Sequence, residues 1–175
     1  MTMQNVIVGM GEALWDVLPE GKKIGGAPAN FAYHVSQFGL DSCVVSAIGD
    51  DKLGEEILDN FKEKELKHLI ETVPYPTGTV QVEIDQAGIP QYDIKENVAW
   101  DNIPYTAMLD DLASRTQAVC FGSLAQRSVV SRKTINSFLD AMPQNDDTLV
   151  VFDVNLRQGF YNKEILCNSM QRCNI

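Results

Sequence analysis

Hydrophobic residues gather in four short runs that are separated by longer amphipathic stretches. The runs are Val6–Met10, Val44–Ile48, Val119–Phe121 and Leu149–Val154. They show little alternation with polar residues, which is typical of strands buried on both faces of a parallel sheet. Because helical patterns lie between them, the sequence predicts an α/β fold with a mostly parallel sheet flanked by helices.

Four stretches place apolar residues three or four positions apart, as in helices with one buried face. We predict helices over residues 28–39, 53–61, 106–115 and 131–142. Pro28 suits a first helical turn, since its missing N–H would have no partner there. Gly39 is placed to end the same helix.

The segment TVQVEIDQAGIPQYDIK breaks this rhythm. Val80, Val82 and Ile84 alternate with polar residues, a turn containing Gly88 follows, and a second alternating stretch runs from 91 to 95. This pattern predicts an antiparallel hairpin with one apolar face. We expect a substrate cleft or a second subunit to cover that face, and the alternative is an edge hairpin that packs on its own domain.

The 175 residues are 45% hydrophobic and carry a formal net charge of −10. That charge argues against nucleic acid or an anionic membrane as the main partner, because both reward basic patches. The apolar runs are too short to span a bilayer, and no basic-then-apolar leader opens the chain. The four cysteines and two histidines lack metal-ligand spacing, so we expect reduced thiols, no metal site and a cytoplasmic location.

The first predicted strand delivers a carboxylate, Asp16, to the edge of the sheet where ligands bind in α/β proteins. Gly25 and Gly26 precede a helix start, and Asn30 lies in its first turn. A carboxylate accepts hydrogen bonds from vicinal hydroxyls, and an amide both donates and accepts. These residues suit a polyol such as a sugar, whereas the alternative is an ordinary turn that begins a helix.

The stretch GGAPANFA at residues 25–32, followed by Gly39 and by Gly49 in SAIGDD, resembles the first signature of the ribokinase-like (PfkB) carbohydrate kinases. Further segments agree in the family's order: GEALWD at 11–16, PTGTV at 76–80, FGSLA at 121–125 and DVNLR at 153–157. The agreement covers residues 9–157 and is nearest to the fructokinase branch.

The resemblance implies ATP-dependent phosphorylation of a sugar hydroxyl, with fructose as the expected substrate and Mg²⁺ as the accompanying ion. It implies a Rossmann-like domain with a small antiparallel β lid, at about residues 12–24 and 76–102, through which a homodimer would form. Asp16, Gly25, Gly26 and Asn30 match positions that bind the sugar.

Asp153, Asn155 and Arg157 match the family's D-x-N-x-R element near the phosphate-transfer region. A guanidinium there would offset negative charge on the phosphoryl group. The alternative for Arg157 is a salt bridge to a neighbouring acid.

Family members are about twice as long and carry a G-A-G-D-type motif in their second half, whose aspartate is the general base. That motif and the ATP-binding loops are absent from this sequence. We therefore expect the chain to be the N-terminal portion of a sugar kinase, truncated before its ATP-binding half and inactive alone, with no catalytic residue of its own.

Two other hypotheses stay open at this point. The chain could be a non-catalytic sugar-binding or dimerising fragment. It could also come from a family kinase that acts on a nucleoside or on another sugar.

Overall fold

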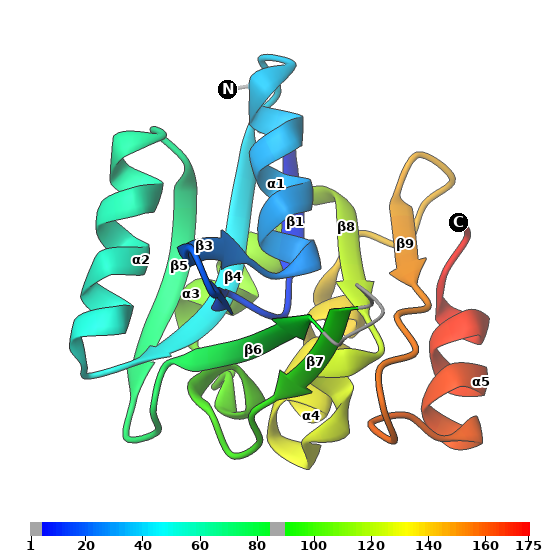
Figure 1. The fold of residues 1–175 in the computed structure, drawn as a ribbon. Coiled ribbons are helices and arrows are strands. Elements are labelled where there is room, and N and C mark those ends of the chain that lie inside the picture. Colours follow the sequence, from blue (N-terminus) through cyan, green and yellow to red (C-terminus); the bar gives the residue numbers. More distant parts are fainter. Residues whose placement is uncertain (1–4, 85–89) are drawn as a thin grey trace.

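The computed structural model describes residues 5–84 and 90–175, and its main element is a five-stranded sheet (Figure 1). The strand order is β5-β4-β1-β8-β9, and every neighbouring pair is parallel. The strands are β1 Val6–Met10, β4 Ser42–Gly49, β5 Lys67–Val73, β8 Thr116–Gly122 and β9 Leu149–Asp153. The predicted fold class, a mostly parallel α/β sheet flanked by helices, is confirmed.

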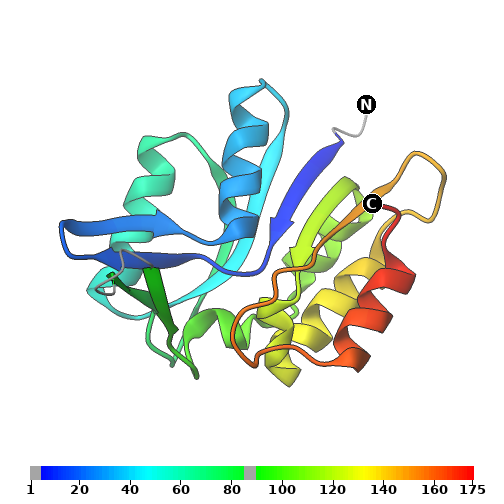
Figure 2. The same ribbon diagram turned by 45° about the vertical axis from the view of Figure 1, so that its right-hand side comes forward.

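Helices cover both faces of this main sheet (Figures 1 and 2). They are α1 Ala27–Gln37, α2 Lys52–Glu63, α3 Ala107–Ser114, α4 Val129–Ala141 and α5 Lys163–Arg172, with short 3-10 turns η1 Ala99–Asn102 and η2 Leu124–Arg127. Val44 and Ile48 of β4 pack with α1 and α2, whereas Val45 and Ala47 pack in the core that includes α3 and α4. The alternation along β4 therefore separates two hydrophobic cores.

Strand β5 and helix α5 were not predicted. The sequence of β5, KHLIETV, carries three charged or titratable side chains and is only partly buried at the sheet edge. Helix α5 ends at Arg172, and Asn174 and Ile175 then form backbone hydrogen bonds with β9, including Asn174 N to Val150 O at 2.9 Å.

A second, smaller sheet lies across the carboxyl ends of the main strands (Figure 1). Its order is β3-β2-β6-β7, with β2 Leu14–Leu18, β3 Gly21–Gly25, β6 Gly78–Ile84 and β7 Pro90–Ile94. The predicted hairpin is the antiparallel pair β6–β7, and its expected turn at Gly88 lies outside the described residues.

The small sheet is mixed and not wholly antiparallel as expected, because β2 pairs with β6 in parallel. The cause is its connection to the main sheet. β2 follows β1 and β6 follows β5, and those two strands of the main sheet run in the same direction. The β1–β2 and β5–β6 connections therefore both start at the carboxyl edge of the main sheet, and β2 and β6 run through the small sheet in the same direction.

The apolar face of the hairpin is covered by the chain itself. Val80, Val82 and Ile94 are all less than 8% exposed and belong to the same core as Trp100. Gly78 permits this packing, because a Cβ at that position would collide with the Trp100 indole. The hairpin thus packs on its own domain, while Val80 and Ile94 also line a cavity between the two sheets.

Thr77 and Asp51 tie the start of β6 to the main sheet. Thr77 donates to the Asp51 carboxylate from its backbone N at 2.8 Å and from Oγ1 at 2.7 Å. Asp51 also caps α2, accepting from Gly54 N at 2.9 Å. Burial alone would raise the pKa of Asp51, but these hydrogen bonds from Thr77 and Gly54 lower it below its ordinary value.

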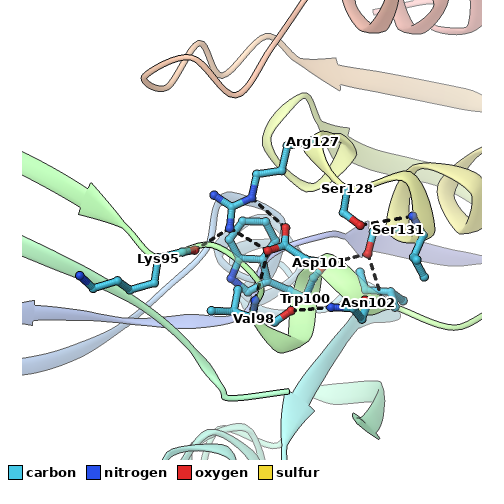
Figure 3. Close-up of polar contacts among 10 residues, drawn as sticks. Lys95, Val98, Trp100, Asp101, Asn102, Arg127, Ser128 and Ser131 are labelled. Carbon is cyan, nitrogen blue, oxygen red and sulfur yellow. Dashed lines mark hydrogen bonds and ion pairs between the residues drawn. The ribbon is translucent and has the colours of Figure 1, made fainter. Parts of the chain in front are cut away.

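Arg127 makes the second attachment (Figure 3). It donates to Asp101 from Nε at 2.8 Å and from Nη2 at 2.9 Å, and Nη2 also donates to the carbonyl of Lys95, just after β7. Its guanidinium lies 4.1 Å from the ring centre of Trp100 and 4.4 Å from that of Phe160. Since both side chains of the ion pair are only 7% exposed, this is a buried charge pair.

Replacing Arg127 with alanine should lower the free energy of unfolding by about 3–5 kcal/mol, because Asp101 would keep a buried charge without its partner. The matched control is Arg115→Ala, which removes the exposed pair with Asp111 and should cost about 0–1 kcal/mol. Urea unfolding of the two variants measures the difference. Equal losses would contradict the assignment of Arg127 as a buried attachment.

Candidate functional site

A cavity of about 290 Å³ lies where the small sheet faces the carboxyl edge of the main sheet. Its polar lining residues are Glu12, Asp16, Asn30, Asn155 and Arg157. Its apolar walls include Leu14, Val80, Tyr92, Ile94 and Leu124. The volume is close to the roughly 300 Å³ at which small-molecule sites begin.

The cavity brings together five of the seven residues that the sequence analysis selected. Asp16 comes from β2, Gly26 from the bend between β3 and α1, and Asn30 from the first turn of α1. Asn155 and Arg157 come from the segment that follows β9. Asn30 and Asn155, which are 125 positions apart in the chain, thus share one cavity. The two others, Gly25 and Asp153, do not line it.

Glycine is required at the bend before α1. Gly26 has φ +106°, and a Cβ there would collide with the carbonyl oxygen of Glu12. A Cβ on Gly25 would collide with the Asp16 carboxylate. Gly25 therefore leaves room for the Asp16 side chain, although it does not line the cavity itself.

Helix α1 begins at this bend without a side-chain cap. Gly26 occupies the N-cap position and Pro28 lies in the first turn, so few backbone N–H groups there have a partner. Asn30 donates its backbone N–H to Gly26 O at 2.9 Å, and its side chain is exposed. The helix start thus offers backbone donors and an amide to the cavity.

Asp16 and Arg157 carry opposite charges in this cavity. Asp16 lies on β2 opposite Lys23 and is half-buried. Burial raises the pKa of the Asp16 carboxyl, and the positive charge of Arg157 partly offsets that rise. A polar ligand between them would meet an acceptor on one side and a cationic donor on the other.

The segment after β9 is held by its own backbone and side chains. Ser123 Oγ donates to Asn155 O at 2.8 Å, and Arg157 Nε donates to Asn155 Oδ1 at 2.8 Å. The Arg157 guanidinium also lies 5.4 Å from the ring centre of Tyr92 in β7. Across the described ranges Arg157 forms no ion pair with an acid, so the alternative of a structural salt bridge finds no support.

Asp153 has a backbone role in the same segment. Its carbonyl oxygen accepts from Ser123 N at 3.2 Å and from Asn155 N at 2.8 Å, which fixes the exit from β9. Asp153 therefore orients the segment that carries Asn155 and Arg157, although Asp153 itself does not line the cavity.

Glu12 is a cavity residue that the sequence analysis did not select. It is 2% exposed, and its Oε2 has no hydrogen-bond partner within the described part of the chain. Burial, together with the nearby negative charges of Asp153 and Asp101, raises its pKa to about 7, against the lowering effects of its own backbone N–H and of Arg127. The available signal was its sequence position, two residues after a buried strand.

A second polar cavity, of about 360 Å³, lies beside the Arg127–Asp101 pair. It contains none of the predicted site residues, and its main cation already pairs with Asp101. The cavity that contains Asp16 is therefore the stronger candidate for a ligand site.

The part of the chain that the structure describes contains neither a candidate metal site nor a candidate membrane-spanning helix. No group of three or more histidine, cysteine or acidic side chains could hold a metal ion there. Within the same ranges, no helix combines the length and the apolar character needed to cross a bilayer.

A protein-family model matches most of this chain, including most of the residues that line the cavity. The family model described as pfkB family carbohydrate kinase matches residues 19–172. The sugar kinase PH1459 of Pyrococcus horikoshii is 29% identical over 165 residues, which cover 87% of this chain and 52% of that relative. The ATP-dependent 6-phosphofructokinase of Thermoanaerobacterium thermosaccharolyticum is 31% identical over 144 residues, which cover 81% of this chain and 44% of that relative.

Solved structures agree with the fold. The crystal structure of PH1459 matches with a TM-score of 0.79 at 26% identity, over 96% of this chain and 58% of that one. A second crystal structure of PH1459 contains ATP and matches with a TM-score of 0.76. Fructokinase from Vibrio cholerae matches with a TM-score of 0.80 at 21% identity, over 99% of this chain and 62% of that one. The chain thus spans about half the length of the relatives that it matches.

The raised pKa of Glu12 predicts a loss of stability as the pH rises. Its folded pKa of about 7 lies above the ordinary 4.5, so the native state holds a proton that the unfolded chain releases. Its contribution to the free energy of unfolding is fully present below about pH 4.5 and is lost by about pH 7, a change of about 3 kcal/mol.

Glu12→Gln removes this titration. The free energy of unfolding of wild type should therefore fall relative to that of Glu12→Gln between pH 5 and pH 8, as measured by urea unfolding. Glu63→Gln, at an exposed position, is the control and should follow wild type. Parallel curves for wild type and Glu12→Gln would contradict the burial of an uncompensated carboxyl.

Proposed function

Because the chain belongs to the pfkB family of carbohydrate kinases, we propose that it supplies the sugar-binding part of an ATP-dependent sugar kinase. The proposed reaction transfers a phosphoryl group to a sugar hydroxyl, and fructose is the first candidate substrate. The relatives named as sugar kinase, phosphofructokinase and fructokinase support this reaction class.

One observation carries the proposal: a single cavity holds Asp16, Asn30 and the Gly26 bend together with Asn155 and Arg157. The Asp16 carboxylate would accept hydrogen bonds from sugar hydroxyls, and Asn30 would donate and accept. Arg157, with its guanidinium over Tyr92, would lie toward the transferred phosphoryl group and offset its negative charge. The apolar small-sheet residues Val80 and Ile94 would exclude water from the sugar.

The residues present do not fit the nucleotide and its Mg²⁺. Among the described residues, the cavity has one cationic side chain, Arg157, and no group of three or more histidine, cysteine or acidic side chains could hold a metal ion. The general base that the family resemblance implies lies in a motif that is absent from this sequence. We therefore place ATP, Mg²⁺ and the base on residues outside this sequence and assign this chain binding and orientation only.

The charge of the cavity favours an unphosphorylated sugar over a sugar phosphate. The cavity is lined by two carboxyl groups, those of Glu12 and Asp16, and by one arginine, Arg157. The phosphate group already present on a sugar phosphate would therefore be repelled by the excess of carboxyl groups. A nucleoside is a weaker candidate, because Tyr92 is the one aromatic ring among the described cavity residues that could stack on a base. These arguments favour a neutral polyol such as fructose.

Two further expectations accompany this function. A cytoplasmic location is consistent with the family. Homodimer formation through the small sheet stays a prediction. Sedimentation of the purified chain measures the oligomeric state directly.

Asp16→Ala should weaken fructose binding to the 175-residue chain by about 1–3 kcal/mol, because a half-buried acceptor for hydroxyl groups is lost. Titration calorimetry measures the affinity. Asp50→Ala, an exposed aspartate outside the cavity, serves as the control and should bind like wild type. Unchanged affinity in Asp16→Ala would show that the polyol site lies elsewhere.

A kinase assay separates an enzyme part from a non-catalytic sugar-binding fragment. We expect no turnover of fructose and MgATP by the 175-residue chain. A fusion of this chain to the part of PH1459 that it does not match should turn over, and Asp16→Ala in the fusion should reduce that turnover. Turnover by the chain alone would overturn the assignment of the base to residues outside it, whereas a folded fusion inactive on all hexoses would count against a sugar kinase.

A further inference from the structure

We propose that Glu12 is a further ligand-binding residue of this cavity, where its carboxylate accepts a hydrogen bond from a hydroxyl of the bound sugar. The inference rests on the sugar-binding function proposed above and assigns it an additional residue. It starts from a feature that neither the fold nor the roles of Asp16 and Arg157 explain.

Glu12 occupies a position where a structural residue would be apolar. It lies two residues after the central strand β1, lines the cavity and is 2% exposed. Its neighbours Ala13 and Leu14 are equally buried and belong to the two hydrophobic cores. Buried acidic residues almost always have a partner, yet Glu12 Oε2 has none within the described residues.

The cation whose charge acts on Glu12 forms no ion pair with it within the described residues. Arg127 influences the charge of Glu12, but its Nε and Nη2 are engaged with Asp101 and with the carbonyl of Lys95 (Figure 3). Its Nη1 is also buried and unpartnered in the part of the chain described. The fold thus keeps a buried carboxyl and a buried arginine without a hydrogen bond between them, so the described residues give this carboxyl oxygen no structural partner.

Glu12 and Asp16 would reach the sugar from different elements. Asp16 lies on the small sheet, whereas Glu12 follows the central strand of the main sheet. Two carboxylates on separate walls can each accept from a different hydroxyl. The cavity would therefore select ligands with hydroxyl groups on two sides, and it would discriminate against analogues that lack either one, because a buried acceptor would stay unpaired.

Charged groups on three elements surround Glu12 and set the sign of its pH dependence. Asp153 at the end of β9 and Asp101 in η1 disfavour its ionised form, and Arg127 in η2 favours it. In the cavity itself Asp16 and Arg157 carry opposite charges. A hydroxyl that donates to Glu12 stabilises the carboxylate, so sugar binding should release a proton and should tighten as the pH rises.

The test measures fructose affinity by titration calorimetry at pH 6 and pH 8 for the 175-residue chain. With a free pKa of about 7, linkage predicts about tenfold tighter binding by wild type at pH 8 than at pH 6. In Glu12→Gln this ratio should fall to about one, and the affinity at pH 8 should be about tenfold lower than that of wild type.

Asp16→Asn and Glu63→Gln are the comparison variants. Asp16→Asn should bind more weakly at both pH values but keep the tenfold ratio, and Glu63→Gln should match wild type in both respects. His34 and His68 do not line the cavity and are present in all variants, so they cannot produce the difference. Melting temperatures confirm that each variant is folded.

The outcomes separate the two claims. Wild type that binds fructose with the same affinity at both pH values, or Glu12→Gln that keeps the tenfold ratio, would overturn the role of Glu12 and leave the sugar site in place. A change in melting temperature alone would assign Glu12 a structural role. Wild type that binds no hexose would overturn the sugar site and the role of Glu12 together.

Discussion

The close approach of helix α1 to the central strand is the contact on which the rest of the structure depends. A Cβ on Gly9 of β1 would collide with the carbonyl of Pro28 in α1, and a Cβ on Gly26 would collide with the carbonyl of Glu12. Only glycine permits both contacts, so the helix start lies directly against the end of the strand. As a consequence, the first residues of α1, Asp16 and Glu12 line one cavity.

The other wall of the cavity depends on how the small sheet is attached. Asp51 and Thr77 fix the start of β6 to the main sheet, and Arg127 with Asp101 fixes the segment after β7. Because the apolar face of the hairpin is buried in the same core as Trp100, the small sheet is continuous with the domain in this structure. Its residues Val80, Tyr92 and Ile94 then close the cavity opposite the main sheet.

Most of the main sheet could be predicted from hydrophobic pattern, since β1, β4 and β8 are mostly buried apolar runs and α1 to α4 have clear apolar stripes. The apolar run of β9 also forms a strand, but at the edge of the sheet only its Phe152 is buried, so the expected burial on both faces was wrong there. Strand β5 was not predicted, because an edge strand that contains Lys67, His68 and Glu71 has no continuous run of apolar residues. The parallel pairing of β2 with β6 is a long-range property that no local pattern encodes. In the site, Asp16, Gly26 and Asn30 follow from strand, bend and helix start, whereas Glu12 becomes visible only when its burial and missing partner are known.

The central claim is that the cavity between the two sheets holds a small carbohydrate by its hydroxyl groups. A crystal of this chain soaked with fructose tests that claim most directly. The account predicts electron density for the sugar between the Gly26 bend and Arg157, with hydroxyl groups within hydrogen-bond distance of the Asp16 carboxylate. Fructose bound at another surface, or bound in the cavity without contact to Asp16, would contradict it.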